Sequence, residues 1–115
     1  MIINKTREKI LAHNVKVYGS ILLKAKGLMF SGKLKDSGIV FWFNSEKKRS
    51  LHMLFVFFPI DVLFLDAKRD IVEMKENFRP FTFYYPRHSS KYIIELPAGT
   101  IKSTETGIGD EINFT

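Results

Sequence analysis

Apolar side chains dominate the middle of this chain. Between Leu51 and Ile60 there is no Asp, Glu, Lys or Arg, and apolar residues occupy both sides of the alternation that a β-strand imposes. A strand that is apolar on both faces must be covered on both sides, so it belongs inside a sheet rather than at its edge. The run predicts an interior strand that bends at Pro59, which lacks a backbone N–H, and resumes over 61–66.

Shorter alternating stretches predict the remaining strands. In the stretch 9–18 we expect Val15 and Val17 to face inward and Lys16 and Tyr18 outward. The stretch 1–4 is expected to be an edge or closing strand. Further strands are expected at 39–43, 71–76, 92–96 and 111–114, with a solvated connection of hairpin length at 44–50 and a tight turn at 67–70.

Two short segments have helix-start and helix-stop residues. Ser20 is a suitable N-cap for a helix at about 20–26 that Gly27 would end. Pro97 precedes a second short helix at about 98–105, which Gly107 would end. The whole pattern predicts one mainly β domain over 1–115: a barrel- or jelly-roll-like sandwich of mostly antiparallel strands with one or two short helices.

Composition narrows the class of protein. The 115 residues include 11 Phe, enough for a well-supplied core, and we expect Met29, Trp42 and Met53 to be part of it. There is no Cys, which excludes disulfides, thiolate metal sites and a cysteine nucleophile. The N-terminal residues do not resemble a secretory leader, and the apolar run is shorter than the roughly 20 residues that cross a bilayer. We therefore expect a cytoplasmic protein without a cofactor or a metal.

Positive charge is concentrated in the first half of the chain. Residues 1–60 hold 11 Lys and Arg against 3 acids, or +8, whereas residues 61–115 hold 7 against 9, or −2. Such asymmetry can attract an anionic partner. The one dense cluster is Lys47-Lys48-Arg49, with no aromatic residues interleaved, so a solvated basic surface is favoured and nucleic-acid binding is the weaker alternative.

Four groups of residues carry a family resemblance. They are Gly27-Leu28-Met29; Met53 followed by Pro59-Ile60-Asp61; Glu95-Leu96-Pro97-Ala98-Gly99; and Gly107-Ile108-Gly109-Asp110. In this order and spacing they resemble domain of unknown function 192, also called uncharacterised protein family 0127, over about Lys9 to Phe114. His52 stands where Trp is usual. The resemblance implies a mainly β sandwich and no assigned activity.

Two acids stand among apolar neighbours. Asp61 follows Ile60 and precedes Val62, and we expect its carboxylate to accept hydrogen bonds from backbone N–H groups at the Pro59 bend. Glu95 is expected to bond to the start of the helix that follows Pro97. The alternative is an acid pair: if the two carboxyl groups faced each other in one cleft, they could serve a small hydrolase or lyase.

The remaining candidates for a site are apolar or aromatic. The segment 77–91 contains Phe78, Phe81, Phe83, Tyr84 and Tyr85, and is expected to be a lid or a binding surface. His52 is expected in the core more readily than as a metal ligand. The candidate ligand-binding residues are Asp61, Glu95, His52, Met53, Phe81 and Tyr84. The sequence favours a non-catalytic module that binds a small molecule, a carbohydrate or a partner, and leaves catalysis open.

Overall fold

The computed structural model describes residues 1–19, 36–49, 51–52, 58–80 and 82–115. The elements are β1 (Ile2–Asn4), β2 (Lys9–Ala12), β3 (Asn14–Gly19), β4 (Ser37–Lys47), β5 (Leu51–His52), β6 (Ile60–Leu65), β7 (Ile71–Phe78), β8 (Phe83–Tyr84), β9 (Ser90–Pro97), α1 (Thr100–Ser103) and β10 (Ile112–Phe114). The predicted mainly β fold is confirmed.

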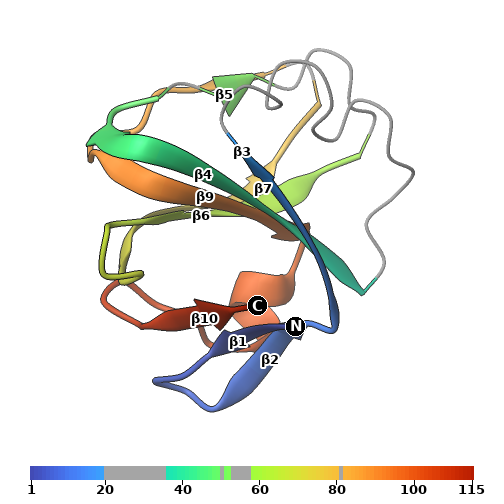
Figure 1. Ribbon diagram of the computed structural model, residues 1–115. Helices are drawn as coiled ribbons and strands as arrows, with labels where there is room; N and C mark the ends of the chain where they lie inside the picture. The colour runs from blue at the N-terminus through green and yellow to red at the C-terminus, as the bar shows by residue number, and fades with distance from the viewer. Residues whose placement is uncertain (20–35, 50, 53–57, 81) are drawn as a thin grey trace.

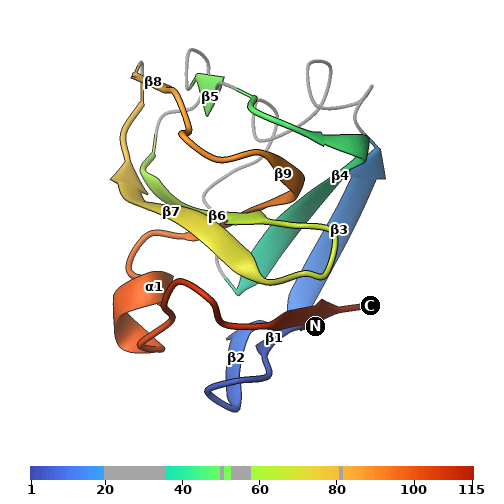
Figure 2. The ribbon, with the colours of Figure 1, turned by 90° about the vertical axis from the view of Figure 1, so that its left-hand side faces the viewer.

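Two sheets form the sandwich, as Figure 1 shows. The larger has the order β3-β4-β9-β6-β7, and every pairing in it is antiparallel except that of β3 with β4. The smaller, of order β10-β1-β2, lies beneath it beside α1 (Figure 2). A short ribbon of β5 and β8 lies on the other side of the larger sheet. Among the described strands neither sheet closes on itself, so the part of the fold that the structure describes is a sandwich.

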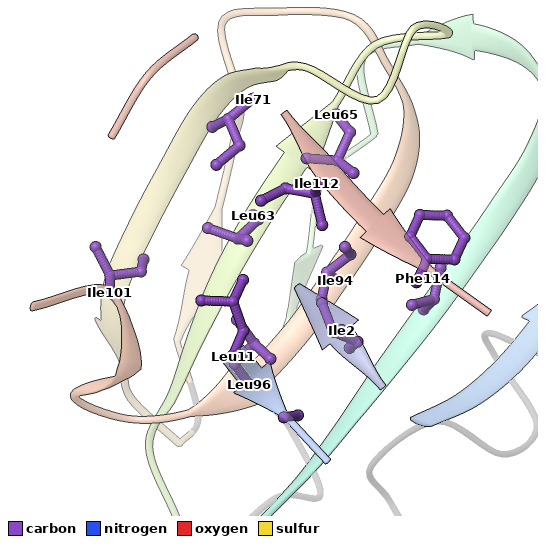
Figure 3. Packing of buried hydrophobic residues seen from close by; sticks show 12 residues of the cluster. Ile2, Leu11, Leu63, Leu65, Ile71, Ile94, Leu96, Ile101, Ile112 and Phe114 are labelled. Carbon is purple, nitrogen blue, oxygen red and sulfur yellow. The ribbon is translucent and has the colours of Figure 1, made fainter. Parts of the chain in front are cut away.

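The main core fills the space between the two sheets (Figure 3). Alternation along β6 and β9 directs Leu63, Leu65, Ile94 and Leu96 toward the smaller sheet, and we call this side the proximal face of the larger sheet. Ile2, Leu11, Ile112 and Phe114 meet it from the smaller sheet. The sheets approach so closely that a Cβ on Gly38 would lie 2.4 Å from Cδ1 of Ile2, so only glycine fits there.

The opposite side of the larger sheet, the distal face, is also apolar. It carries Ile39, Phe41, Phe43, Ile60, Val62, Phe64, Phe78 and Ile93, all buried. Tyr84 of β8 packs on it, with its ring centroid 5.7 Å from that of Phe64. Because both faces of the larger sheet are covered, β6 is buried along its whole length. A strand with apolar residues on both faces requires such cover.

The central apolar run is confirmed as an interior strand over 60–65, but the expectation is wrong at 51–52, which lie in a two-stranded ribbon and not inside a sheet. β6 resumes after Pro59, and it forms with β7 the hairpin whose turn was expected at 67–70. The first part of the run begins as β5, which pairs with β8. The expected core positions Met29 and Met53 lie outside the described residues, as does the expected helix at 20–26.

The expected single strand at 9–18 is wrong, because the chain passes from one sheet to the other at His13. β2 pairs with β1, whereas β3 pairs with β4. The smaller sheet covers Val15 but does not reach Val17, which is 48% exposed, and Tyr18 packs on Phe41 of the distal face instead of pointing outward. The expectation for 1–4 also fails on position: β1 lies between β10 and β2, not at an edge.

β4 continues through the polar segment that was expected to be a connection. Its register shifts between Trp42 and Lys47, and this irregularity absorbs the extra polar residues before Lys47 pairs with Ser90. Arg49 fastens the end of the strand: its guanidinium donates to the carbonyls of Ser90 (2.7 Å) and Ser45 (2.8 Å) and lies 3.8 Å from the Phe43 ring centroid. Trp42 is 42% exposed and is not a core residue.

The second expected helix is confirmed, although it is shorter than 98–105. α1 spans Thr100–Ser103 and follows Gly99, whose φ of 94° is a conformation that glycine adopts without strain. In the part of the chain that the structure describes, no helix is long and apolar enough to cross a bilayer.

Candidate ligand-binding site

Asp61 is a structural acid. Its carboxylate is 1% exposed and accepts three backbone hydrogen bonds: Oδ1 from Asn77 N at 2.9 Å, and Oδ2 from Gly99 N at 3.1 Å and Ile101 N at 2.9 Å. The expectation that Asp61 satisfies backbone N–H groups is confirmed. The expected source of those groups is wrong, since they come from the end of β7 and the start of α1 and not from the Pro59 bend.

Glu95 lies one strand away from Asp61 but on the other side of the sheet. Glu95 pairs with Val62 and Ile39, both on the distal face, whereas Asp61 pairs with Leu96, on the proximal face. Residues on adjacent strands that are offset by one position point to opposite faces. The hypothesis of an Asp61–Glu95 acid pair is therefore wrong: the sheet itself separates the two carboxyl groups.

Glu95 also does not bind the start of α1, as the sequence had suggested. That helix begins on the proximal side, where Asp61 accepts hydrogen bonds from the backbone N–H groups of Gly99 and Ile101. Glu95 is 8% exposed, and no hydrogen bond joins its carboxyl group to another part of the described chain. Burial raises its pKa to about 8, because the apolar neighbours stabilise the neutral acid over the carboxylate.

A third acid, Glu73, organises the distal side. Oε1 accepts hydrogen bonds from Arg87 N (2.9 Å), His88 N (2.9 Å) and His88 Nδ1 (2.8 Å), and Oε2 accepts one from the Tyr84 hydroxyl. Burial alone would raise the pKa of Glu73, but these donors outweigh burial and lower it. Burial and the bond to Glu73 raise the pKa of Tyr84 to about 12. Glu73 thus fixes the segment 84–88 onto β7.

A hollow of about 490 Å³ opens beside Tyr84, at the end of β7. Its described lining consists of Lys75, Glu76, Asn77, Phe78, Arg79, Thr82, Phe83 and Tyr84. Amide, hydroxyl and guanidinium groups therefore meet aromatic rings at one opening. Asp61 supports the wall of the hollow from the proximal side. Its hydrogen bond from Asn77 N holds Asn77, which is part of this wall, in a left-handed backbone conformation (φ 50°).

Aromatic rings at the mouth of the hollow face away from the core. Alternation along β8 packs Tyr84 onto the distal face and places Phe83 and Tyr85 on the other side. The rings of Phe83 and Tyr85 stack, with centroids 6.4 Å apart and planes at 14°, and are 53% and 71% exposed. Phe83 and Tyr85, which we call the ring pair, are more exposed than the other exposed aromatic residue of the described chain, Trp42, at 42%.

The structure separates the candidate residues. Tyr84 lines the hollow, Asp61 supports its wall from the proximal side, and Glu95 lies on the distal face among apolar residues. His52 pairs with Phe83 through the backbone of the β5-β8 ribbon. Met53 and Phe81 lie outside the described residues. Within the described ranges, no three His, Asp or Glu side chains are grouped closely enough to hold a metal ion.

Sequence reasoning missed Glu73 and His88 as a pair. They are 15 positions apart and form a link only because β7 and the following segment fold back on each other. Periodicity places Glu73 on the same side as Ile71, but the register shift in the β6-β7 pairing puts Ile71 opposite Leu65 and Glu73 opposite Phe64, on different faces. The available signal was an acid between Val72 and Met74 in an otherwise apolar strand start.

In the basic cluster at 47–49, the side chain of Arg49 is engaged in contacts within the protein. Arg49 is occupied by backbone carbonyls and the Phe43 ring, and burial lowers its pKa. A nucleic-acid surface needs cations that reach phosphates. The geometry of Arg49 therefore weakens the nucleic-acid hypothesis.

Comparison with known proteins places the chain in a family. The family model DUF192, described as an uncharacterized ACR, matches residues 2–114. The chain belongs to the DUF192 family. A UPF0127 protein of Thermococcus sibiricus is 40% identical over 99% of this chain and 74% of the relative, and one of Pyrococcus horikoshii is 32% identical over 99% and 98%. The expected family resemblance is confirmed.

Solved structures agree on the fold of this DUF192 chain. A Novosphingobium aromaticivorans protein of unknown function has a TM-score of 0.86 at 20% identity, covering 98% of this chain and 82% of its own. A Sinorhizobium meliloti protein described as a candidate transcription regulator has a TM-score of 0.79 at 26% identity, covering 86% and 79%.

Two of the motifs that carry the DUF192 resemblance meet in this structure. Asp61 of the Pro-x-Asp motif accepts a hydrogen bond from the backbone N–H of Gly99, which ends the Glu95–Gly99 motif. In the last motif Asp110 accepts from Gly107 N (2.9 Å) and from Asn4 Nδ2 (2.9 Å), and these bonds together with Arg7 lower its pKa despite burial. The motif residues Asp61, Gly99 and Asp110 therefore act as ties between elements.

Proposed function

We propose that this DUF192 chain is a non-catalytic binding module that takes a carbohydrate at the hollow beside Tyr84. The observation that carries the proposal is the exposed, nearly parallel ring pair of Phe83 and Tyr85 at an opening lined by polar side chains. A pyranose ring has an apolar C–H face and a hydroxyl rim. The first packs on an aromatic face and the second needs donors and acceptors.

The lining supplies both kinds of contact. Asn77 and Thr82 can donate and accept hydrogen bonds, Glu76 accepts, and Lys75 and Arg79 donate. Such a mixture of aromatic and convergent polar groups is typical of small-ligand sites. The hollow is partly open to solvent, which suits a sugar at the end of a chain more than a fully enclosed ligand.

Preorganisation of the walls supports binding over chemistry. Glu73 fixes one wall through Tyr84, Arg87 and His88, and Asp61 fixes the other through Asn77. A surface held in its binding geometry loses little entropy when a ligand arrives. The acids that once suggested a hydrolase lie on opposite faces of the sheet, so the arrangement of Asp61 and Glu95 supports a module without catalysis.

A panel of neutral and acidic mono- and oligosaccharides, tested by calorimetry and by chemical-shift perturbation, checks this proposal. We expect binding in the range of about 0.1–1 mM, typical of small shallow sites, with shifts confined to 75–79 and 82–85. Phe83→Ala and Tyr85→Ala should each abolish the signal. Trp42→Ala, which removes an exposed aromatic residue on another part of the sheet, is the matched control and should bind like the wild type.

Two results would contradict the proposal. No sugar of the panel shifting the residues of the hollow would remove it outright. Equal loss of binding in Trp42→Ala and Tyr85→Ala would show that the effect is one of general aromatic surface and not of this site.

A further inference from the structure

We infer that the ligand of this hollow is an anionic saccharide, with its carboxylate or phosphate bound between Lys75 and Arg79. This inference rests on the proposed function and adds the chemical class of the sugar. Two cationic side chains and one acidic one, Glu76, line the opening. Positively charged side chains therefore outnumber negatively charged ones in the described lining.

Neither cation at the opening is neutralised by an ion pair. Among the described residues the ion pairs are Lys5–Glu111, Arg7–Asp110, His13–Asp36 and His88–Glu73, and none of them includes Lys75 or Arg79. The ammonium group of Lys75 lies 5.7 Å from the centroid of the Tyr84 ring, an arrangement that holds it at the hollow without removing its charge.

The buried acid Glu73 is not part of the lining, and its carboxylate oxygens are already paired with Tyr84, Arg87 and His88. The exposed side chain of Arg87, in the segment 84–88 that Glu73 fixes, adds a further positive charge nearby. The three cations Lys75, Arg79 and Arg87 outnumber the two acids Glu73 and Glu76, so the charge around the opening favours an anion.

The chemistry of the two cations suits an anionic substituent on a sugar. Arg79 offers a planar fork that can hold a carboxylate or phosphate with two parallel bonds, and Lys75 adds a point charge. The ring pair of Phe83 and Tyr85 lies at the same opening and offers the apolar platform for the sugar ring. A uronate or a sugar phosphate engages both the rings and the two cations, whereas a neutral sugar has no anionic substituent to pair with Lys75 and Arg79.

Calorimetry at low ionic strength with glucose, glucuronate, glucose 6-phosphate and inorganic phosphate tests the inference. We expect the acidic sugars to bind about five- to tenfold more tightly than glucose, and this excess to shrink as salt is raised. Arg79→Gln and Lys75→Gln should each remove the excess affinity for the acidic sugars over glucose. Lys68→Gln, in the distant turn between β6 and β7, is the matched control and should retain the excess.

The outcomes separate this inference from the proposed function. Equal affinities for glucose and glucuronate at low salt would overturn the inference and leave the carbohydrate module standing. Absence of all sugar binding would overturn the proposed function itself. Inorganic phosphate binding as tightly as glucose 6-phosphate would show a plain anion site and overturn the inference as well.

Discussion

Asp61 and Glu95 lie on neighbouring strands in similar apolar sequence surroundings, yet they differ in the hydrogen-bond donors around their carboxyl groups. Asp61 is nearly inaccessible and receives three backbone N–H groups. Glu95 is almost as buried but receives no hydrogen bond from the described chain, and the pKa of Glu95 is raised to about 8. The comparison teaches that burial alone does not decide the state of an acid; the donors that surround it do.

Glu73 supplies the third case. It is buried like Glu95 but accepts four hydrogen bonds, against the three of Asp61, and its pKa falls below the ordinary value. Asp61 joins α1 to β7 on the proximal side, and Glu73 joins β7 to the 84–88 segment around the hollow. Glu95 joins nothing that the structure describes. The two acids with donors are structural ties, and the acid without them is a cost to stability at neutral and high pH.

The largest effect is expected from Asp61→Ala. Removing the carboxylate leaves three backbone N–H groups, two of them at the start of α1, without an acceptor. We expect a loss of unfolding free energy on the order of 4 kcal/mol, measured by urea denaturation. Glu76→Gln, at an exposed position of β7, should change little. A melt of Asp61→Ala like that of the wild type would show that the three bonds are not structural.

A slightly smaller effect of opposite sign is expected from Glu95→Gln. Because the folded-state pKa of Glu95 is raised to about 8, the folded protein keeps a proton that the unfolded chain has lost from about pH 4.5 upward. The free energy of unfolding should therefore fall as pH rises from about 4.5 to 8. Glu95→Gln should remove this decline and be more stable than the wild type at pH 9, by on the order of 3 kcal/mol.

Denaturation curves at pH 5, 7 and 9 measure this difference. A constant gap between the wild type and Glu95→Gln at all three values would show that Glu95 does not titrate in this range. A Glu73→Gln variant sharpens the comparison. The pKa of Glu73 is lowered in the wild type, so the contribution of the Glu73 carboxylate to the free energy of unfolding is lost as pH falls below the ordinary carboxyl range, which is the reverse of the pH dependence expected for Glu95.

The smallest effect is expected from Tyr84→Phe. This change deletes one hydrogen bond to a charged acceptor, Oε2 of Glu73, while the ring keeps its packing on Phe64 and Phe78. We expect a loss of about 1.5–2 kcal/mol in unfolding free energy. Tyr85→Phe, at an exposed position, is the control. Identical stabilities of the two variants would indicate that the Tyr84 hydroxyl does not hold the wall of the hollow.

The sequence predicted the β class, the β6-β7 hairpin, the C-terminal strand, the second helix and the family. These follow from local patterns: the apolar residues 62–65 place side chains on both faces of a strand, which must then be covered on both sides, and Gly99 fits the positive φ before α1. The prediction failed where a strand left its sheet, as at His13, and where irregular pairing absorbed residues, as in β4. Neither event leaves a mark in the local alternation of side chains.

The candidate site shows the same division. Tyr84 and the aromatic segment around it could be singled out from composition, whereas Glu73, Lys75 and Arg79 could not, because their importance depends on which face each occupies after the register shift in β7. Asp61 was correctly assigned to backbone amides, but those amides lie 16 to 40 positions away.

The amino-acid order by itself determined which segments would be buried, because hydrophobic burial depends on side-chain type and on a period that is read locally. Which buried acid would meet donors and which would not was decided only by tertiary structure, since the register between strands sets the face on which each carboxyl group lies. A shift of one residue between β6 and β9 would place Asp61 and Glu95 on the same face of the sheet.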